Sequence, residues 1–420
     1  PALRTIARIW QSHPGYEDLF RKNLQEHRCG GTSTIGGIKL TRPEGTDKLE
    51  VDLSGLHEAI TNNLKRFGLT VFNVPSIFLG DASGFYAKDK KWLGFDILSP
   101  AFDAAYGDYC RRVGEALRAE GVLDYAIWQV WDEPQDEEMM QAVKHLIGLV
   151  KKAVPEAKVY MTTGIKPELL GQVGIWCLPW PDTYNRRLAA EAKAGGAELW
   201  AYDNSLYSLD VPDSSLLLRH YLWTLRKYGV TGVEWWAISQ WNKDPWLTTN
   251  EYAPQNGGGY FLYPTPDRKG APVNSIRWEM YREGVEDYDL LTLLGQEMDR
   301  AVRAIGCTDP RLAGERQVQD IIDQVVPKLG EVNRDAAVAD RAIEQARARI
   351  EFLRLVPGAV IGKITENGKR VILLATDKET KLLIAGKPNQ ARVASVVLEN
   401  KPVAVQFIRG KVTYEVNLEP

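Results

Sequence analysis

Two adjacent carboxylates, Asp132 and Glu133, are the residues whose spacing most favours chemistry in this sequence. They follow the apolar run Tyr125–Trp131, and Pro134 comes directly after them. Successive strand side chains point to opposite faces, so neighbouring acids reach one site only where the strand ends and the chain turns. Capping of the next helix is the other use for acids here, but Asp136 already suits that role. We therefore expect Asp132 and Glu133 to form an acid/base site at a strand end.

Aromatic side chains gather near other predicted strand ends, in a chain that has 13 Trp and 17 Tyr. Rings cover the flat C–H faces of sugars, whereas carboxylates and amides bind the hydroxyl groups. A place in the apolar core is the alternative for each ring taken alone. We expect a sugar site to be lined by Tyr202, Trp236, Trp241, Trp200, Trp176, Asp182 and Asn204.

A carboxylate pair beside such an aromatic sugar site indicates hydrolysis of glycosidic bonds, which uses two carboxylates in most enzymes. A separate nucleophilic Glu is not evident, because the only Glu of the strand ending at Asp203 is Glu198, at its opposite end. The adjacent pair instead favours attack by a 2-acetamido oxygen of the substrate, with Glu133 as acid/base and Asp132 orienting the amide. Two alternatives stay open: a two-carboxylate β-glycosidase that uses Glu133 with Asp203 or Glu234, and a non-catalytic glycan-binding protein.

The elements that must position these residues alternate between short apolar runs and amphipathic helical stretches. The predicted strands are Leu3–Ile9, Ser33–Ile38, Leu69–Val74, Asp124–Trp131, Lys158–Thr163, Gly174–Leu178, Glu198–Asp203 and Gly232–Ser239. The predicted helices are Tyr16–His27, Leu56–Phe67, Phe102–Ala119, Glu137–Ala153, Pro167–Gln172, Thr183–Ala194 and Asp213–Tyr228. Such alternation predicts a parallel sheet, and eight units predict an α/β fold of the (β/α)8 TIM-like barrel type, whose catalytic groups lie at the carboxyl ends of the strands.

The remainder of the chain predicts two further parts. A long helix opened by Pro272 is followed by a charged helical segment, Asp309–Leu355. From Pro357 the apolar period becomes two, with Gly, Asn and Pro turns, which is typical of a small β-sandwich. This sandwich has few aromatic residues (Phe407, Tyr414), which favours packing over glycan binding. The predicted domains are a catalytic barrel over 1–305, a helical segment packing on the barrel over 306–356, and the sandwich over 357–420.

Composition narrows the classes of partner. The net charge of −3 creates no field for a polyanion, so nucleic acid and anionic membranes are poor partners. We see no run of about 18 apolar residues and expect no transmembrane helix. The five His and four Cys show no metal-ligand spacing, so we expect no metal, no cofactor and free thiols. Because the sequence begins with Pro1, we expect a processed or truncated chain.

The order of motifs resembles the catalytic domain of glycoside hydrolase family 123 over roughly residues 1–300. The motifs are Trp131–Pro134, Leu199–Tyr202, Gly232–Ala237 with Trp241, Gly259–Pro264 and Pro272–Tyr288. The resemblance implies a retaining exo-acting β-N-acetylgalactosaminidase with Glu133 as acid/base and Asp132 as stabiliser of the acetamido group. It also assigns Tyr202, Trp236 and Trp241 to the barrel mouth. Members of the family usually carry an N-terminal β-sandwich, whereas this chain begins at the first predicted strand.

Overall fold

The computed structural model describes residues 2–31, 34–75, 91–134, 136–203, 208–210, 213–248, 256–366, 369–398 and 401–418. Apart from the first two residues, the chain divides into two compact units. The first unit comprises residues 3–218 and 229–282, and the second comprises residues 219–228 and 283–420. The finer division at residues 305 and 356 stays a prediction.

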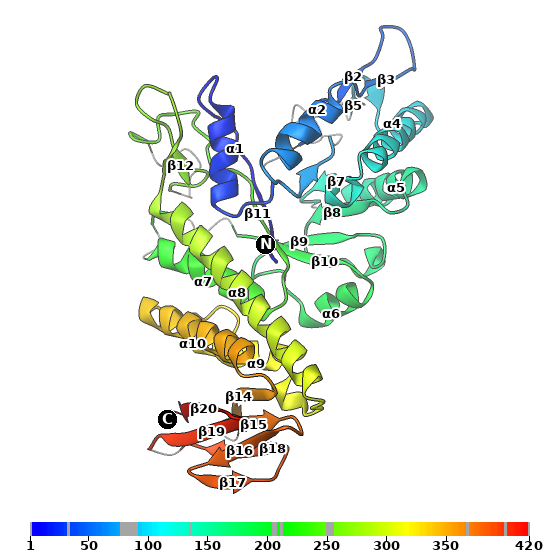
Figure 1. Cartoon of the computed structure of the whole chain (residues 1–420). Coiled ribbons are helices and arrows are strands. Elements are labelled where there is room, and N and C mark those ends of the chain that lie inside the picture. The colour runs from blue at the N-terminus through cyan, green and yellow to red at the C-terminus, as the bar shows by residue number, and fades with distance from the viewer. Residues whose placement is uncertain are drawn as a thin grey trace. The chain divides into compact units, whose positions relative to one another are not determined.

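The first unit is built on a parallel sheet of seven strands (Figure 1). In sheet order the strands are β1 (Arg4–Ala7), β11 (Gly232–Trp235), β10 (Glu198–Tyr202), β9 (Ile175–Pro179), β8 (Lys158–Thr162), β7 (Ala126–Asp132) and β4 (Phe72–Asn73). Between the two edge strands lie the isolated parallel bridges Ile6–Gly31 and Thr34–Asn73. The sheet is therefore a nearly closed barrel.

The predicted strand Ser33–Ile38 is wrong for the part of it that the structure describes, where the one pairing is the bridge at Thr34. The preceding residues explain part of this result. A Cβ atom on Gly31 would lie 2.1 Å from the carbonyl oxygen of Val71, so only glycine permits this close approach. The chain thus passes between β1 and β4 with single bridges, and the count of eight strands is not confirmed.

Helices follow the strands as predicted, with one exception. They are α1 (Glu17–Glu26), α2 (Leu56–Ile60) with the π-helical turn η1 (Thr61–Lys65), α4 (Pro100–Ala119), α5 (Glu137–Ala153), α6 (Arg186–Ala194) and α7 (Ser214–Lys227). The exception is the stretch predicted as a helix over Pro167–Gln172, which forms only the 3-10 turn η3 (Pro167–Leu169). Asp136 caps α5, because its side chain accepts a hydrogen bond from the Met139 amide at 2.8 Å.

The first unit also contains short antiparallel pairs of strands. They are β2 (Lys39–Thr41) with β3 (Glu50–Asp52), β5 (Lys91–Trp92) with β6 (Phe95–Asp96), and β12 (Leu262–Tyr263) with β13 (Val273–Asn274). The first pair forms an antiparallel excursion that precedes α2.

The barrel interior has an apolar layer centred on Trp200. This layer contains Ile6, Val71, Ile127, Tyr160, Ile175, Cys177 and Trp200. The indole N–H of Trp200 donates to Glu198 at 3.0 Å, and the Arg4 guanidinium lies 5.5 Å from the ring centroid. A Cβ atom on Gly232 would lie 2.3 Å from the Trp200 ring, so glycine makes room for the indole. Trp200 is therefore a core residue of the barrel.

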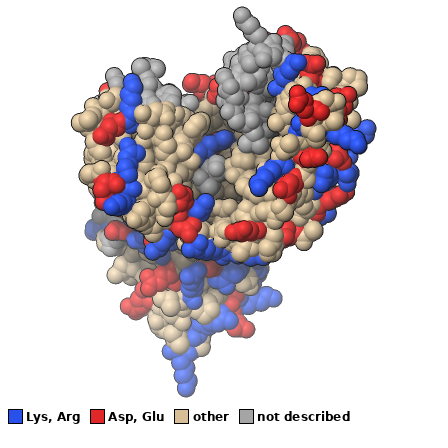
Figure 2. Space-filling model, turned by 90° about the horizontal axis from the view of Figure 1, so that it is seen from above, with Lys and Arg blue, Asp and Glu red and all other residues tan. Residues whose placement is uncertain are grey.

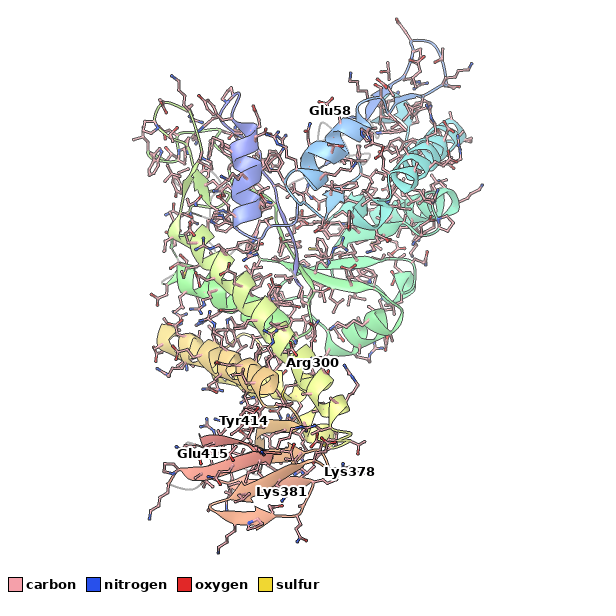
Figure 3. All side chains as sticks on the ribbon, in the orientation of Figure 1. Glu58, Arg300, Lys378, Lys381, Tyr414 and Glu415 are labelled. Carbon is pink, nitrogen blue, oxygen red and sulfur yellow. The ribbon has the colours of Figure 1, made fainter. Side chains whose placement is uncertain are left out.

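The second unit combines helices with two antiparallel sheets. Its elements include α9 (Gly314–Val325), α10 (Ala336–Leu355) and the strands β14 (Ala359–Glu366), β15 (Lys369–Thr376), β16 (Thr380–Ile384), β17 (Lys387–Asn389), β18 (Val393–Val397), β19 (Val403–Arg409) and β20 (Val412–Leu418), while α8 (Ile276–Ala304) runs through both units. The sheet orders are β14-β15-β18 and β17-β16-β19-β20. Phe407 is fully buried and packs against Phe352. Figure 3 shows Tyr414 and Glu415 on β20, where Tyr414 is half-buried and Glu415 is exposed.

The surface and the cysteines agree with an ordinary composition. Figure 2 shows acidic and basic side chains interspersed over one face of the molecule, in keeping with the net charge of −3. Among the described residues, no helix has the length and apolarity that a membrane span requires. All four cysteines are free thiols, as predicted, and three of them are buried.

The close approach of Gly232 to Trp200 predicts a packing defect on substitution. Gly232→Ala should lower the free energy of unfolding by about 1–3 kcal/mol, because the added methyl group overlaps the indole ring. The matched control is Gly107→Ala in α4, where no atom lies within 4 Å of the added Cβ and stability should rise by about 0.5–1 kcal/mol. Urea unfolding of both variants measures the difference. Equal stability of the two would show that Trp200 does not fill the barrel as described.

Candidate active site

The end of β7 carries a β-bulge that sets the direction of its last side chains. Against β8, Gln129 pairs with Tyr160 and Trp131 pairs with Met161, so one extra residue lies between them. Without the bulge, Gln129 and Trp131 would share a face and Asp132 would point the opposite way. With it, Asp132 joins the face of Gln129, whose Nε2 donates to Asp132 Oδ1 at 3.2 Å. The bulge therefore turns Asp132 toward the barrel interior.

Glu133 follows in a backbone conformation that is uncommon for a side-chain-bearing residue. Its φ of 44° lies in the left-handed region, which costs of order 1–3 kcal/mol when the surrounding structure imposes it. Thr162, at the end of β8, holds this turn because its Oγ1 accepts from the Glu133 amide at 3.0 Å. The same hydroxyl donates to Asp132 Oδ1 at 2.6 Å. One threonine thus fixes the backbone of one acid and the side chain of the other.

Tyr202, at the end of β10, binds the second acid directly. Its hydroxyl donates to Glu133 Oε1. Burial, and next the hydrogen bond to the Glu133 carboxylate, raise the pKa of Tyr202, so its phenol remains a donor at neutral pH. Asp132 and Glu133 are both exposed, whereas Tyr202 is half-buried. The two carboxylates are accordingly open to a ligand from solvent.

An ion pair between the half-buried Arg8 and the buried Glu234 lies beside these acids. Arg8 Nε donates to Glu234 Oε1 at 2.7 Å, and the Tyr160 hydroxyl donates to the other oxygen of the same carboxylate. Burial raises the pKa of Glu234, and the positive charge of Arg8 opposes that rise. Because it is buried and bonded by two donors, Glu234 is poorly placed to act as an exposed nucleophile.

The sequence does not predict the contacts that Arg8, Gln129, Tyr160 and Thr162 make around the acids. A signal existed for Arg8, since a charged residue within a predicted apolar strand is rare without a partner. No comparable signal marked Thr162, because threonine is an ordinary strand residue.

Two of the predicted sugar-binding residues are corrected by their burial. Trp200 belongs to the apolar layer described above, and its side chain is fully buried. Trp176 is also fully buried. It is the neighbour of Cys177, which faces the barrel interior, so strand alternation turns Trp176 outward. Neither ring is available to stack on a sugar.

Trp241 is corrected for a similar reason. Its ring is 4% exposed, its indole N–H donates to the Leu262 carbonyl at 2.9 Å, and it packs against His13 and Phe20. A ring that is enclosed in this way supports the loop after β11 and does not offer a face to a ligand.

Trp236 remains at the rim of the barrel and is half-buried. Its ring meets that of Trp10 edge to face at 6.3 Å, and the Trp10 indole N–H donates to the Trp236 carbonyl at 2.7 Å. Trp10 is 57% exposed and was not predicted to take part. Asp182 lies exposed on the turn after β9, and Asn204 lies outside the described residues. In the part of the chain that the structure describes, Trp236 and Trp10 thus form a partly exposed aromatic pair.

The arrangement joins two unlike carboxyl groups. Asp132 accepts hydrogen bonds from Thr162 and Gln129, whereas Glu133 accepts one from the phenol of Tyr202. A pair of this kind can supply a charged acceptor and a proton donor to one ligand.

The chain is similar to known glycoside hydrolases. The family model described as "Glycoside hydrolase 123, catalytic domain" matches residues 58–294. A family 123 glycoside hydrolase from Clostridium perfringens, studied for glycolipid glycan hydrolysis, is similar in structure, with a TM-score of 0.56 and 15% identity, covering 84% of this chain and 68% of that one. The endo-beta-1,4-mannanase from Thermotoga petrophila gives a TM-score of 0.42 at 10% identity, covering 100% of this chain and 97% of that one. No curated protein matches the sequence.

The double role of Thr162 predicts a loss of turnover without a loss of fold. Thr162→Val keeps the shape of the side chain but removes the hydroxyl that bonds Asp132 and the Glu133 amide. Hydrogen bonds to charged groups contribute about 1.5–3 kcal/mol, so kcat/KM for a chromogenic glycoside should fall about 10- to 100-fold. Thr162→Ser retains the hydroxyl and should recover most of the activity. A valine variant as active as the serine variant would contradict this role.

Proposed function

The chain belongs to glycoside hydrolase family 123, and we propose that it is a retaining exo-glycosidase that releases terminal β-linked N-acetylgalactosamine by substrate-assisted catalysis. The glycoside hydrolase class follows from the family. The sugar, the stereochemical outcome and the oxazoline mechanism are the proposal. Glycans or glycolipids are the proposed substrates, and the glycolipid part is supported by the work on the Clostridium perfringens relative.

The observation that carries the proposal is the identity of the donors on the adjacent acids, because Thr162 and Gln129 donate to Asp132 and Tyr202 donates to Glu133. Asp132 receives hydrogen bonds from Thr162 and Gln129, so its oxygens are oriented before a ligand arrives. An oriented carboxylate can accept the N–H of a 2-acetamido group and balance the positive charge that develops on the ring formed from it. Glu133 is exposed and bonded by Tyr202, as suits a group that exchanges a proton with a ligand.

The reaction then proceeds in two displacements at the anomeric carbon. In the first, the acetamido oxygen bonds to that carbon as the glycosidic bond breaks, and Glu133 gives its proton to the leaving oxygen. In the second, Glu133 removes a proton from water, whose oxygen attacks the same carbon and opens the oxazoline ring. Each displacement inverts the configuration, so the product retains it.

The structure offers little to the alternative with a protein nucleophile. Glu234 is buried and bonded to Arg8 and Tyr160. Asp203, the other acid named by the sequence, is 7% exposed. Both acids lack the exposure that Asp132 and Glu133 have.

Substrate contacts from the rim are also part of the proposal. Tyr202 and Trp236 are the predicted aromatic residues that keep some exposure, and Asp182 presents a carboxylate on the turn after β9. We assign sugar stacking to Trp236 and hydroxyl binding to Asp182. Asn204 stays a candidate from the sequence.

Paired nitrophenyl glycosides test the mechanism. The β-GalNAc and β-GlcNAc glycosides should be cleaved and the β-galactoside and β-glucoside should not, because only the first two carry the internal nucleophile. The ratio of kcat/KM between the two cleaved sugars measures the preference for GalNAc. Cleavage of a plain galactoside or glucoside would show that a protein nucleophile exists.

Substitution of each acid tests its role separately. Asp132→Asn should lower kcat about 100- to 1,000-fold, since a key stabilising group is commonly worth about 3–4 kcal/mol. Glu133→Gln should abolish turnover of substrates with poor leaving groups while binding persists. The matched control is Asp136→Asn, a nearby exposed acid whose capping role asparagine can fill, and it should keep normal rates. A near-normal rate for Asp132→Asn would refute the substrate-assisted assignment.

A further inference from the structure

The side-chain amide of Gln129 is held between Asp132 and two donors. Its Oε1 accepts from Arg8 Nη2 at 3.2 Å and from Asn73 Nδ2 at 3.3 Å, while its Nε2 donates to Asp132 at 3.2 Å. The arginine nitrogen can only donate, so the oxygen of the amide must face Arg8 and its nitrogen must face Asp132. Gln129 is 8% exposed, so its surroundings are almost entirely protein. The orientation of this amide is therefore imposed from the side of Arg8.

Arg8 is itself fixed at both its backbone and its side chain. Its amide donates to the Trp235 carbonyl at 3.0 Å, and its carbonyl accepts from the Ile238 amide at 3.0 Å. Its guanidinium contacts Glu234 Oε1 through Nε at 2.7 Å and through Nη2 at 2.5 Å, and Nη2 also donates to Gln129 Oε1 at 3.2 Å. The planar fork of arginine spans two acceptors at once, which the single ammonium of lysine does not do. Glu234 thus anchors the edge of the guanidinium from which Nη2 also reaches Gln129.

We infer that Arg8 and Gln129 are positioning residues for Asp132, a role that rests on the proposed function. Contacts run from Glu234 to Arg8, from Arg8 to Gln129, and from Gln129 to Asp132. They fix one carboxylate oxygen of Asp132, so the carboxylate is oriented before substrate binds. Asn73 supports the same amide from β4. Asp132 meets the acetamido N–H, and Arg8 and Gln129 act only through it.

This role has a kinetic signature. A loosened Asp132 weakens an interaction that strengthens as the oxazoline ring forms, so the loss falls on the transition state more than on ground-state binding. Gln129→Met keeps the length of the side chain and removes the amide. Arg8→Lys keeps a positive charge beside Glu234 and removes the fork. Both variants should lower kcat about 10- to 100-fold with KM changed less than about threefold.

The matched control lies on β1, which ends directly before Arg8. Arg4, four residues earlier, forms an ion pair with Glu198 at 2.9 Å, at the opposite end of β10 from Tyr202. Arg4→Lys makes the same chemical change in β1 without touching Asp132, and it should keep kcat near that of the unsubstituted enzyme. Urea unfolding of all variants checks that each is folded.

A double-mutant cycle on the β-GalNAc nitrophenyl glycoside decides the proposal. In the Asp132→Asn background, Gln129→Met and Arg8→Lys should each change kcat less than about threefold, because their target has already been removed. Full multiplication of the losses, or a Gln129→Met enzyme with an unchanged kcat, would overturn the positioning role while the proposed function stands. A normal rate for Asp132→Asn alone would instead overturn both. An equal loss in Arg4→Lys and Arg8→Lys would show that the effect comes from strand stability.

Discussion

The bulge in β7 is the constraint on which the rest of the site depends. It changes the parity of the strand after Gln129, so that Trp131 leaves the interior face and Asp132 enters it. Thr162 then meets both acids, and Glu133 takes up its left-handed backbone at the following residue. A regular strand would place Asp132 among the buried side chains outside the barrel, where an unpaired carboxylate is costly.

The barrel interior changes character along its axis. The layer around Trp200 is apolar apart from a few polar tips, and it fills the barrel where Gly232 leaves room for the indole. Beside it, the half-buried Arg8 pairs with the buried Glu234, and their attraction and further hydrogen bonds offset the cost of desolvation. Such a pair adds little net stability compared with apolar packing, but it fixes the orientation of polar groups around it. The polar layer thus orients the side chains around it, and the apolar layer stabilises the fold.

The similarity to a solved family member shows how little sequence this architecture needs. At 15% identity the two chains share the fold. The orientation of Asp132, in contrast, depends on a local bulge and on the hydroxyl of Thr162. The fold places strand ends around one mouth. The same barrel serves many reactions, so the reaction is decided by the chemical groups at that mouth.

The sequence by itself determined the alternation of strands and helices, the antiparallel strands after residue 357 and the place of Asp132 and Glu133 at a strand end. Each of these is a local pattern: an apolar period, a capping residue such as Asp136, or two acids before Pro134. The prediction of a strand over Ser33–Ile38 was wrong because the close approach at Gly31 depends on a carbonyl distant in sequence, that of Val71. Local periodicity contains no information about such an approach.

Only the tertiary structure decided which aromatic rings are buried and which groups surround the acids. Trp176, Trp200 and Trp241 look alike in sequence to Trp236, yet their exposure is set by neighbours on other strands and loops. Arg8 and Glu234 are 226 residues apart, and their pairing follows from the meeting of β1 with β11 in the barrel. The sequence gives the type of each residue and the local apolar period directly. Burial and contact partners depend on long-range packing, about which no single segment contains information.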